Sequence, residues 1–213
     1  MRLSGQFAIG VVVALVAGSE LCSQPISRDP NAAEVAALLR ARGHSGAAVS
    51  VLSQARGPQP RQKMDEIADS LVAIAVSFPG KDPRSASTRE RALTALLSAG
   101  MGASGVFGIE RGVPYVGAAD RLMQMVETAE DVGIRVAALE GLTRLPNKTK
   151  VLPFLRSVAT SQNRMAYRAV TLLTEETGPE GQAIARELYR HGQVTQRTAK
   201  EMIDRAAGSY GWR

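Results

Sequence analysis

The sequence contains very few of the side chains on which most enzymes and metal proteins depend. Its 213 residues include one cysteine, two histidines and only 4% aromatic residues. A single cysteine excludes a disulfide framework and every metal site built from several thiolates. Two histidines, His44 and His191, leave little material for a histidine-based zinc site or a catalytic triad. We therefore expect a protein without enzymatic activity, cofactor or metal.

The rest of the composition is that of an ordinary globular domain. Hydrophobic residues make up 45% of the chain and charged residues 22%, which is close to the average of folded proteins. The net charge of +6 comes from 21 arginines and 5 lysines against 20 acidic residues. No basic run occurs, so we expect a solvated charged surface with at most weak attraction to anionic envelope polymers or lipid headgroups.

The amino-terminal segment has the pattern of an export signal. Residues 7–17 form a continuous apolar run of eleven residues, whereas a helix that spans a bilayer needs about 20. This length suits the hydrophobic region of a signal peptide, and Ala17, Gly18 and Ser19 follow as small residues for cleavage. We predict a signal peptide over 1–23, a flexible lead-in over 24–30, and a periplasmic or secreted protein. The alternative is a buried first helix or strand.

Cys22 lies close to this cleavage site and raises the question of a lipid anchor. A bacterial lipoprotein signal needs small side chains directly before the cysteine, but Glu20 and Leu21 occupy these positions. We therefore do not expect lipid attachment at Cys22.

Apolar residues from Asn31 onward follow helical spacing. No stretch alternates apolar and polar residues over six positions, and prolines and glycines separate the periodic segments, where a helix begins or ends. The pattern predicts helices at 31–42, 46–55, 61–77, 84–99, 115–128, 131–145, 149–160, 163–177, 180–190 and 195–207. We predict an all-α domain over 31–207 and a tail over 208–213.

Pairs of these helices recur along the chain. One apolar stripe begins at Arg135, and a second copy follows with a shift of 31 residues. The first stripe continues through Ala138, Leu139, Leu142 and Leu145, the helix after it carries Val151, Leu152, Leu155 and Val158, and the second copy has Ala166, Ala169, Val170 and Leu173, then Ala183, Ile184 and Leu188. Such a pair cannot bury its stripe alone, so stacked pairs that share a core are expected. The 32 alanines suit closely packed helices.

An earlier copy carries an insertion. Its first helix has Arg89, Ala92, Leu93 and Leu96, and its second helix would carry Val116, Ala119, Leu122, Met125 and Val126. Between the two helices, Gly100–Gly112 contains a G-x-G-x-x-G. A dinucleotide site needs a strand before this motif. A helix precedes it here, so we interpret the segment as an inserted loop.

The chain resembles the HEAT-repeat family at this point. The resemblance rests on Asp131, Arg135, Ala138, Leu139 and Leu142, which follow the pattern acidic-x-x-x-Arg-x-x-Ala-Leu-x-x-Leu. A short break at 145–147 and the apolar residues of 151–155 are similar to the second helix of such a repeat. The resemblance is best over 131–160 and extends over 84–190, with an alanine, Ala166, in place of the arginine in the next copy. It implies an α-solenoid of three to four stacked antiparallel helix pairs that presents a helical face to a partner.

These features predict a monomeric scaffold that binds a protein partner of unknown identity. We place the groove along 115–128, 149–160 and 180–190, with the inserted loop at its rim. The candidate contact residues are Lys148, Lys150, Arg156, Arg186, Phe107 and Ile109. If the amino terminus is not a signal peptide, the alternative is a basic nucleic-acid-binding repeat protein. A hydrolase would need His44 or His191 beside a nucleophile such as Ser104.

Two further interpretations concern single residues. Asp65 and Asp69, four positions apart, are expected on a solvated helix face. Trp212, the only tryptophan, is expected to cover the apolar edge of the last helix pair. The alternative for Trp212 is an exposed aromatic anchor for a partner.

Overall fold

A computed structural model describes residues 61–77, 83–103 and 112–212. Every regular element within these ranges is a helix, so this part of the chain is all-α, as predicted. The elements are α3 (Arg61–Ser77), α4 (Pro83–Gly100), α5 (Ala118–Thr128), α6 (Val132–Arg144), α7 (Val151–Thr160), α8 (Met165–Thr171), the π-helical η4 (Leu172–Glu176), α9 (Gly178–Arg190) and α10 (Arg197–Tyr210). The predicted signal peptide, the lead-in, helices 31–42 and 46–55, Cys22 and His44 lie outside the described residues, as do Ser104, Phe107 and Ile109.

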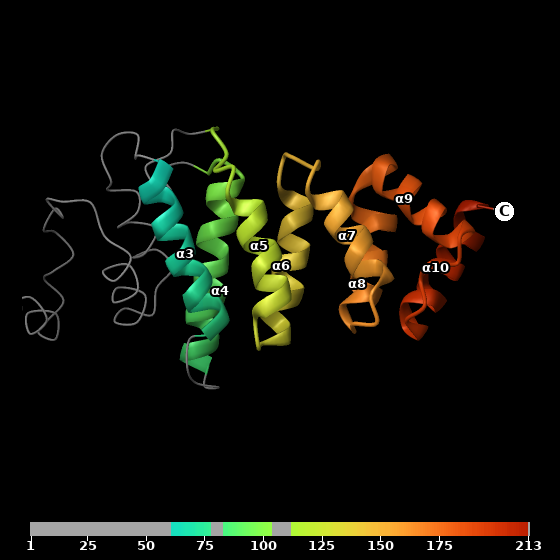
Figure 1. Ribbon diagram of the computed structural model, residues 1–213, viewed down its shortest axis with the longest axis horizontal. Helices are drawn as coiled ribbons and strands as arrows, with labels where there is room; N and C mark the ends of the chain where they lie inside the picture. The colour runs from blue at the N-terminus through green and yellow to red at the C-terminus, as the bar shows by residue number, and fades with distance from the viewer. Residues whose placement is uncertain (1–60, 78–82, 104–111, 213) are drawn as a thin grey trace, which may run out of the picture.

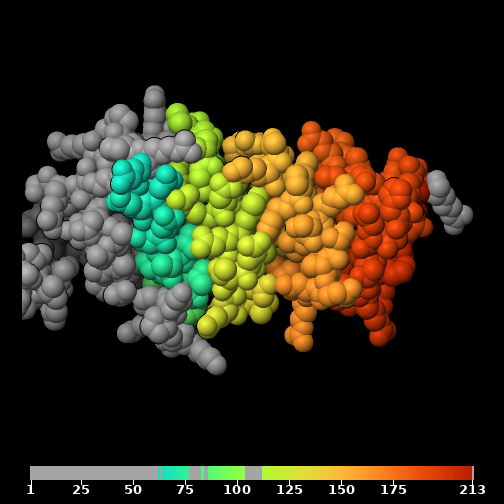
Figure 2. Space-filling model, viewed as in Figure 1, coloured from blue at the N-terminus to red at the C-terminus, as the bar shows by residue number. Residues whose placement is uncertain are grey.

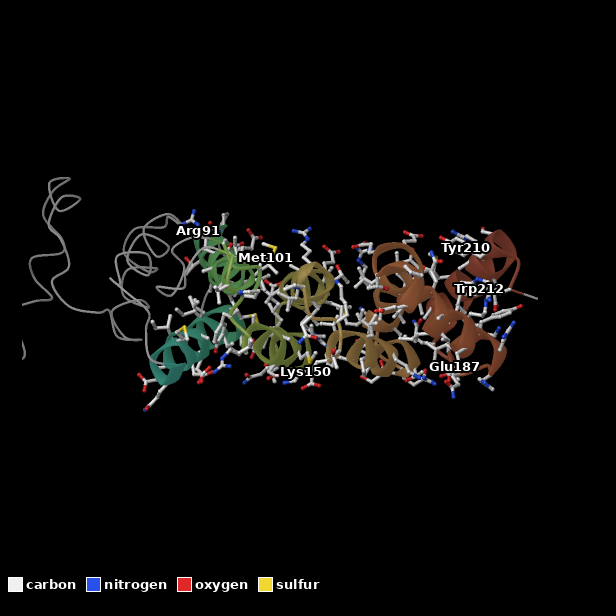
Figure 3. The ribbon with its side chains drawn as sticks, turned by 90° about the horizontal axis from the view of Figure 1, so that it is seen from above. Arg91, Met101, Lys150, Glu187, Tyr210 and Trp212 are labelled. Atoms are coloured by element: carbon white, nitrogen blue, oxygen red, sulfur yellow. The ribbon has the colours of Figure 1, made fainter. Side chains whose placement is uncertain are left out.

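The described helices lie side by side in chain order, from α3 to α10 (Figure 1). Each helix contacts the next along the chain, α3 with α4, α5 with α6, and α7 with α8. Contacts also skip one helix: α4 touches α6, α6 touches α8 and α8 touches α10, while α3 touches α5 and α7 touches α9. The helices therefore form two rows, visible from above in Figure 3. On the face shown in Figure 2, their side chains make a continuous band.

The predicted apolar stripes of α4, α6 and α8 form the core between these rows. Leu96, Leu139 and Leu142 are completely buried. Alanines occupy many of the contact positions, and Ala92, Ala138, Ala166 and Ala169 are buried without any exposed surface. Small side chains at these positions let neighbouring helix axes approach closely, which explains part of the alanine content.

Two predicted core residues are exposed. Val116 is 69% exposed and precedes α5. The N–H of Ala118 bonds to the carbonyl of Tyr115 at 3.2 Å, and this turn buries Tyr115 in place of Val116. Ala183 is also exposed, because Gly181, Ala185 and Leu188 form the buried side of α9. In α5 the predicted stripe from Ala119 to Val126 is buried, so the error at Val116 lies in the predicted start of the helix. In α9 the buried side passes through Gly181 and Ala185 instead of Ala183.

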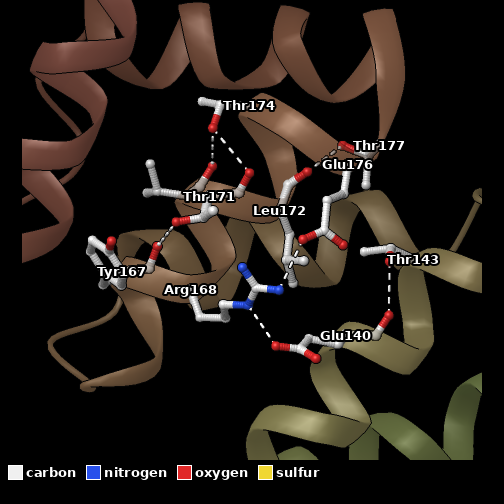
Figure 4. A network of polar contacts seen from close by, with 10 residues as sticks. Glu140, Thr143, Tyr167, Arg168, Thr171, Leu172, Thr174, Glu176 and Thr177 are labelled. Carbon is white, nitrogen blue, oxygen red and sulfur yellow. Dashed lines mark hydrogen bonds and ion pairs between the residues drawn. The ribbon is translucent and has the colours of Figure 1, made fainter.

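The predicted helix 163–177 changes from α-helix to π-helix at Leu172. The hydroxyl of Thr174 donates to the carbonyls of Val170 and Thr171, both at 3.0 Å. The N–H of Thr177 then bonds to the carbonyl of Leu172 at 3.1 Å, five residues back. Figure 4 shows these threonines around the widened turn. Side-chain hydroxyls that bond to backbone carbonyls accompany such a local bulge.

The last helix runs to Tyr210, beyond its predicted end at 207. Gly211 ends it in the left-handed region, with φ of 62°, and the N–H of Trp212 bonds to the carbonyl of Ala207 at 3.0 Å. This Schellman closure turns Trp212 back onto the core. Trp212 is only 3% exposed, and its ring lies 5.5 Å from that of Tyr210. The alternative prediction, an exposed aromatic anchor at Trp212, was therefore wrong. The burial of Trp212 agrees with the prediction that it covers the apolar edge of the last helices.

Candidate functional site

A cavity of about 560 Å³ opens where α3, the start of α5 and the start of α7 meet. One part of its lining is apolar and consists of Pro114, Val116, Ala119, Leu145 and Pro146. The other part carries the charged side chains Asp65, Asp120, Arg121 and Lys150. A volume of this size lies within the range of small-ligand and peptide pockets, about 300–1,000 Å³. This combination of walls makes the cavity the candidate binding site.

Gly100 helps to shape the apolar side of the cavity. A Cβ atom at this position would lie 2.6 Å from Cβ of Ala118 and 2.7 Å from Cδ2 of Leu145. The end of α4, the start of α5 and the end of α6 meet here, and only glycine permits this approach. The break between α6 and α7, which contains Pro146, forms the next part of the wall.

The cavity floor next to α3 is fixed by Arg121. Its Nε donates to Asp69 at 2.9 Å, and its Nη2 lies 3.3 Å from a carboxylate oxygen of Asp65. Arg121 also donates to the carbonyls of Gly117 and Asp65, and its side chain is only 15% exposed. Asp65 and Asp69 thus hold an arginine of another helix. The sequence predicted a solvated face, because nothing in it links positions that lie more than 50 residues apart.

Tyr115 completes this cluster. Its hydroxyl donates to the carboxylate of Asp65, and the guanidinium carbon of Arg121 lies 5.5 Å from the ring centre. Burial, together with the hydrogen bond to Asp65, raises the pKa of the Tyr115 phenol above its ordinary value. The phenol is therefore a neutral hydrogen-bond donor across the physiological range, and it holds the Asp65 carboxylate in place.

The opposite side of the cavity is bridged by an exposed ion pair. Nζ of Lys150 lies 2.8 Å from both carboxylate oxygens of Asp120. The pair joins the first turn of α5 to the residue just before α7, and its side chains are 60% and 53% exposed. Exposed pairs of this kind contribute only about 0–1 kcal/mol to stability, so Lys150 and Asp120 can exchange partners at low cost.

A second, shallower hollow of about 490 Å³ lies between α7 and the segment after α9, beside Arg156, Ser157 and Gln193. Arg156 donates to Glu187 at 3.1 and 2.7 Å and to Gln193 at 3.3 Å. The hydrogen bond from Arg156, its charge and that of His191 lower the pKa of Glu187, although desolvation opposes them. Lys150 and Glu187 lie at one edge of the molecule and Arg91 and Met101 at the other (Figure 3).

The remaining candidate residues are dispersed. Nζ of Lys148 donates to the carbonyl of Thr143, and burial lowers the pKa of Lys148 while Glu180 opposes that shift. Arg186 is exposed on α9 and makes no hydrogen bond or ion pair within the described chain. The structure brings Lys148 and Lys150 to the start of α7, but it does not gather the four predicted cations in one cavity.

Ion pairs between helices also occur in the other row, and helical periodicity did not predict them. Arg168 of α8 donates to Glu140 of α6 at 2.8 Å and to Glu176 of η4 at 2.9 Å (Figure 4). Arg89 of α4 contacts Asp131, which precedes α6, at 3.1 Å. Arg89, Arg121, Arg156 and Arg168 thus each connect one helix to another within the protein.

The described residues hold no group of three or more His, Cys, Asp or Glu side chains arranged to bind a metal. None of the helices in these ranges combines the length and apolar character needed to cross a membrane. The arrangement offers a cavity with an apolar wall, a charged cluster of Asp65, Tyr115 and Arg121, and one exposed ion pair. No protein-family model, curated protein or solved structure significantly matches this chain.

Proposed function

We propose that this protein is an exported, non-catalytic interaction module that binds a protein partner on the row formed by α5, α7 and α9. The observation that carries the proposal is the cavity of about 560 Å³ at the start of α5 and α7, which combines apolar walls with the exposed Asp120–Lys150 pair. Exposed apolar side chains near it, Val113 at 50% and Val116 at 69%, extend the surface available for contact. Exposed apolar residues around a pocket favour protein contacts.

The proposal includes a HEAT-like α-solenoid as the framework. The contacts between consecutive helices, together with those of α3 with α5, α4 with α6, α6 with α8, α7 with α9 and α8 with α10, support stacked pairs. In such an array every pair contacts only its neighbours, and one edge offers an extended binding surface. The predicted groove helices α5, α7 and α9 belong to the same row, which is consistent with a single contact face.

Internal charge pairing favours a protein partner over nucleic acid. Arg89, Arg121, Lys150, Arg156 and Arg168 each contact a carboxylate. Nucleic-acid binding depends on many cations that are available to phosphates. These five of the 26 cations are engaged by carboxylates within the protein and are less available to phosphates, although the net charge stays +6.

Photo-cross-linking in the native cell tests this proposal. A photoreactive amino acid at Ser157, exposed on α7, should give a discrete cross-linked protein product. The matched control is Val132, which is 61% exposed at the start of α6 in the other row and should give none. Equal products at both positions, or none at Ser157, would contradict the proposal. Amino-terminal sequencing of the same material tests export, since an intact Met1 would refute cleavage.

A further inference from the structure

We infer that the cavity at the start of α5 and α7 binds a basic side chain, Arg or Lys, carried by the partner protein. This inference rests on the proposed function and names the chemistry of the partner at that site. The aliphatic stem would lie against Pro114, Val116 and Leu145, and the cationic head would contact Asp120 and Asp65. Long basic side chains commonly bury their stems along apolar surface while the charged head meets a carboxylate.

The carboxylates of the cavity belong to short side chains on two helices. Asp120 is a short side chain in the first turn of α5. Asp65 belongs to α3, and its carboxylate accepts the hydroxyl of Tyr115 and contacts Arg121 at 3.3 Å. Because the reach of an aspartate is short, each carboxylate stays close to its helix, although Asp120 is 53% exposed and bonds only to Lys150 among the described residues. When Lys150 turns away, the lining keeps two carboxylates, Asp65 and Asp120, and one cation, Arg121, so its remaining charge is negative.

Of the two cations in the cavity, Lys150 is more mobile than the carboxylates of Asp65 and Asp120. Lys150 has a long flexible side chain that is 60% exposed, and it lies before α7 rather than within it. It can swing into solvent and leave Asp120 to another cation. Arg121 is engaged by Asp69, Asp65 and two backbone carbonyls and does not compete for Asp120. The site therefore exchanges one cation for another.

Two capped tripeptides are suitable probes for the isolated full-length protein. The first is acetyl-Leu-Arg-Leu-amide, and the second carries Glu in place of Arg. We expect saturable NMR shift changes at α5 and at the segment before α7 with the Arg peptide, and at least about tenfold weaker binding of the Glu peptide. A charge-assisted hydrogen bond that forms with the Arg peptide and is lost with the Glu peptide has an effect of this order.

Variants of the ion pair should move the affinity for the Arg peptide in opposite directions. Lys150→Met removes the competing cation and should tighten binding about two- to fivefold, the equivalent of an exposed pair. Asp120→Asn should weaken it about tenfold. Lys200→Met is the matched control, because it breaks a similar exposed pair with Asp204 on α10 and should leave binding unchanged. If the Asp120–Lys150 pair only supported the structure of the cavity, both Lys150→Met and Asp120→Asn would weaken binding of the Arg peptide.

Equal affinity for the two peptides, absence of saturable binding, or weaker binding by Lys150→Met would overturn the inference. If cross-linking at Ser157 persists in that case, the proposed function stands and only the basic-residue specificity fails. If cross-linking at Ser157 is absent while the Arg peptide binds as expected, the cavity chemistry stands and the placement of the partner on α7 fails.

Discussion

Asp131 shows how one side chain connects helix formation to packing between helices. Its carboxylate accepts the N–H groups of Gly133 at 2.7 Å and Ile134 at 3.4 Å, so it caps the amino terminus of α6. The same carboxylate contacts Arg89 of α4 at 3.1 Å. Four residues later, Arg135 donates to the carbonyl of Val126 at the end of α5. In this copy of the pattern, the acidic and basic positions thus join α6 to α4 and α5.

Replacement of Asp131 should make stability less sensitive to acid. Burial tends to raise the pKa of this carboxyl, but the N–H groups of Gly133 and Ile134 and the Arg89 guanidinium lower it overall, below 3.8. A lowered folded-state pKa means that the stabilisation is present above the ordinary pKa and is lost as the pH falls through the folded value. Asp131→Ala should cost about 0.5–2 kcal/mol at pH 7.

Urea denaturation at neutral and strongly acidic pH measures this effect. The difference between wild type and Asp131→Ala should narrow as the pH falls below 3.8. Asp131→Ser is the matched control, because serine retains the cap but not the ion pair, and it should lose less stability at pH 7. A constant difference across this range would show that the charge of Asp131 does not contribute.

At the level of elements, α8, η4 and α9 form one unit around a tight contact. A Cβ atom on Gly181 would lie 2.8 Å from the carbonyl oxygen of Leu173 and 2.8 Å from Cβ of Thr177, and it would also overlap the Thr177 hydroxyl. The first turn of α9 therefore packs directly onto the backbone of the π-helical segment. This contact fixes the register of α9 and leaves Ala183 on its exposed side.

Gly181→Ala should destabilise this unit despite the better helix propensity of alanine. Overpacking in a closed contact costs about 1–3 kcal/mol, which exceeds the gain of about 0.5–1 kcal/mol from replacing glycine in a helix. Gly208→Ala in α10 is the control, since a Cβ there meets no atom within 4 Å, and it should be neutral or stabilising. Thermal unfolding distinguishes the two variants. Equal unfolding midpoints for Gly181→Ala and Gly208→Ala would show that the structure around Gly181 adjusts to the added methyl group.

The elements differ in how far their sequence predicts them. The bounds of α3 follow from local spacing and agree with the prediction, 61–77. The π-helical turn does not follow from the sequence, because one extra residue in a turn hardly changes the spacing of the apolar residues. The turn also depends on the hydrogen bonds of the Thr174 and Thr177 hydroxyls to backbone carbonyls. The exposure of Val116 depends on the turn that buries Tyr115, and that turn is set by packing rather than by hydrophobicity.

For the whole molecule, the charged residues were the least predictable part. The ion pairs Asp65–Arg121, Asp120–Lys150 and Arg156–Glu187 join α3 to α5, α5 to α7 and α7 to α9. Each pair links positions 30 or more residues apart, so helical periodicity within one segment does not reveal it. The sequence singled out Lys150, just before α7, and Arg156, within α7, but not the carboxylates that accompany them. The candidate cavity likewise depends on the three-dimensional meeting of α3, α5 and the start of α7.

Stability should vary along the row of helices, because most contacts join near neighbours. Leu142 is completely buried in α6, which touches α4, α5, α7 and α8. Leu142→Ala should therefore cost about 2–5 kcal/mol and accelerate hydrogen exchange throughout these helices.

Trp212 lies beside α10, which among the described helices mainly contacts α8 and α9. Trp212→Ala should accelerate exchange in α9 and α10 and leave α4 to α6 protected, as expected where each unit contacts only its neighbours. Native-state exchange by mass spectrometry measures both variants. Equal acceleration in all helices by Trp212→Ala would mean that the row unfolds as one cooperative unit.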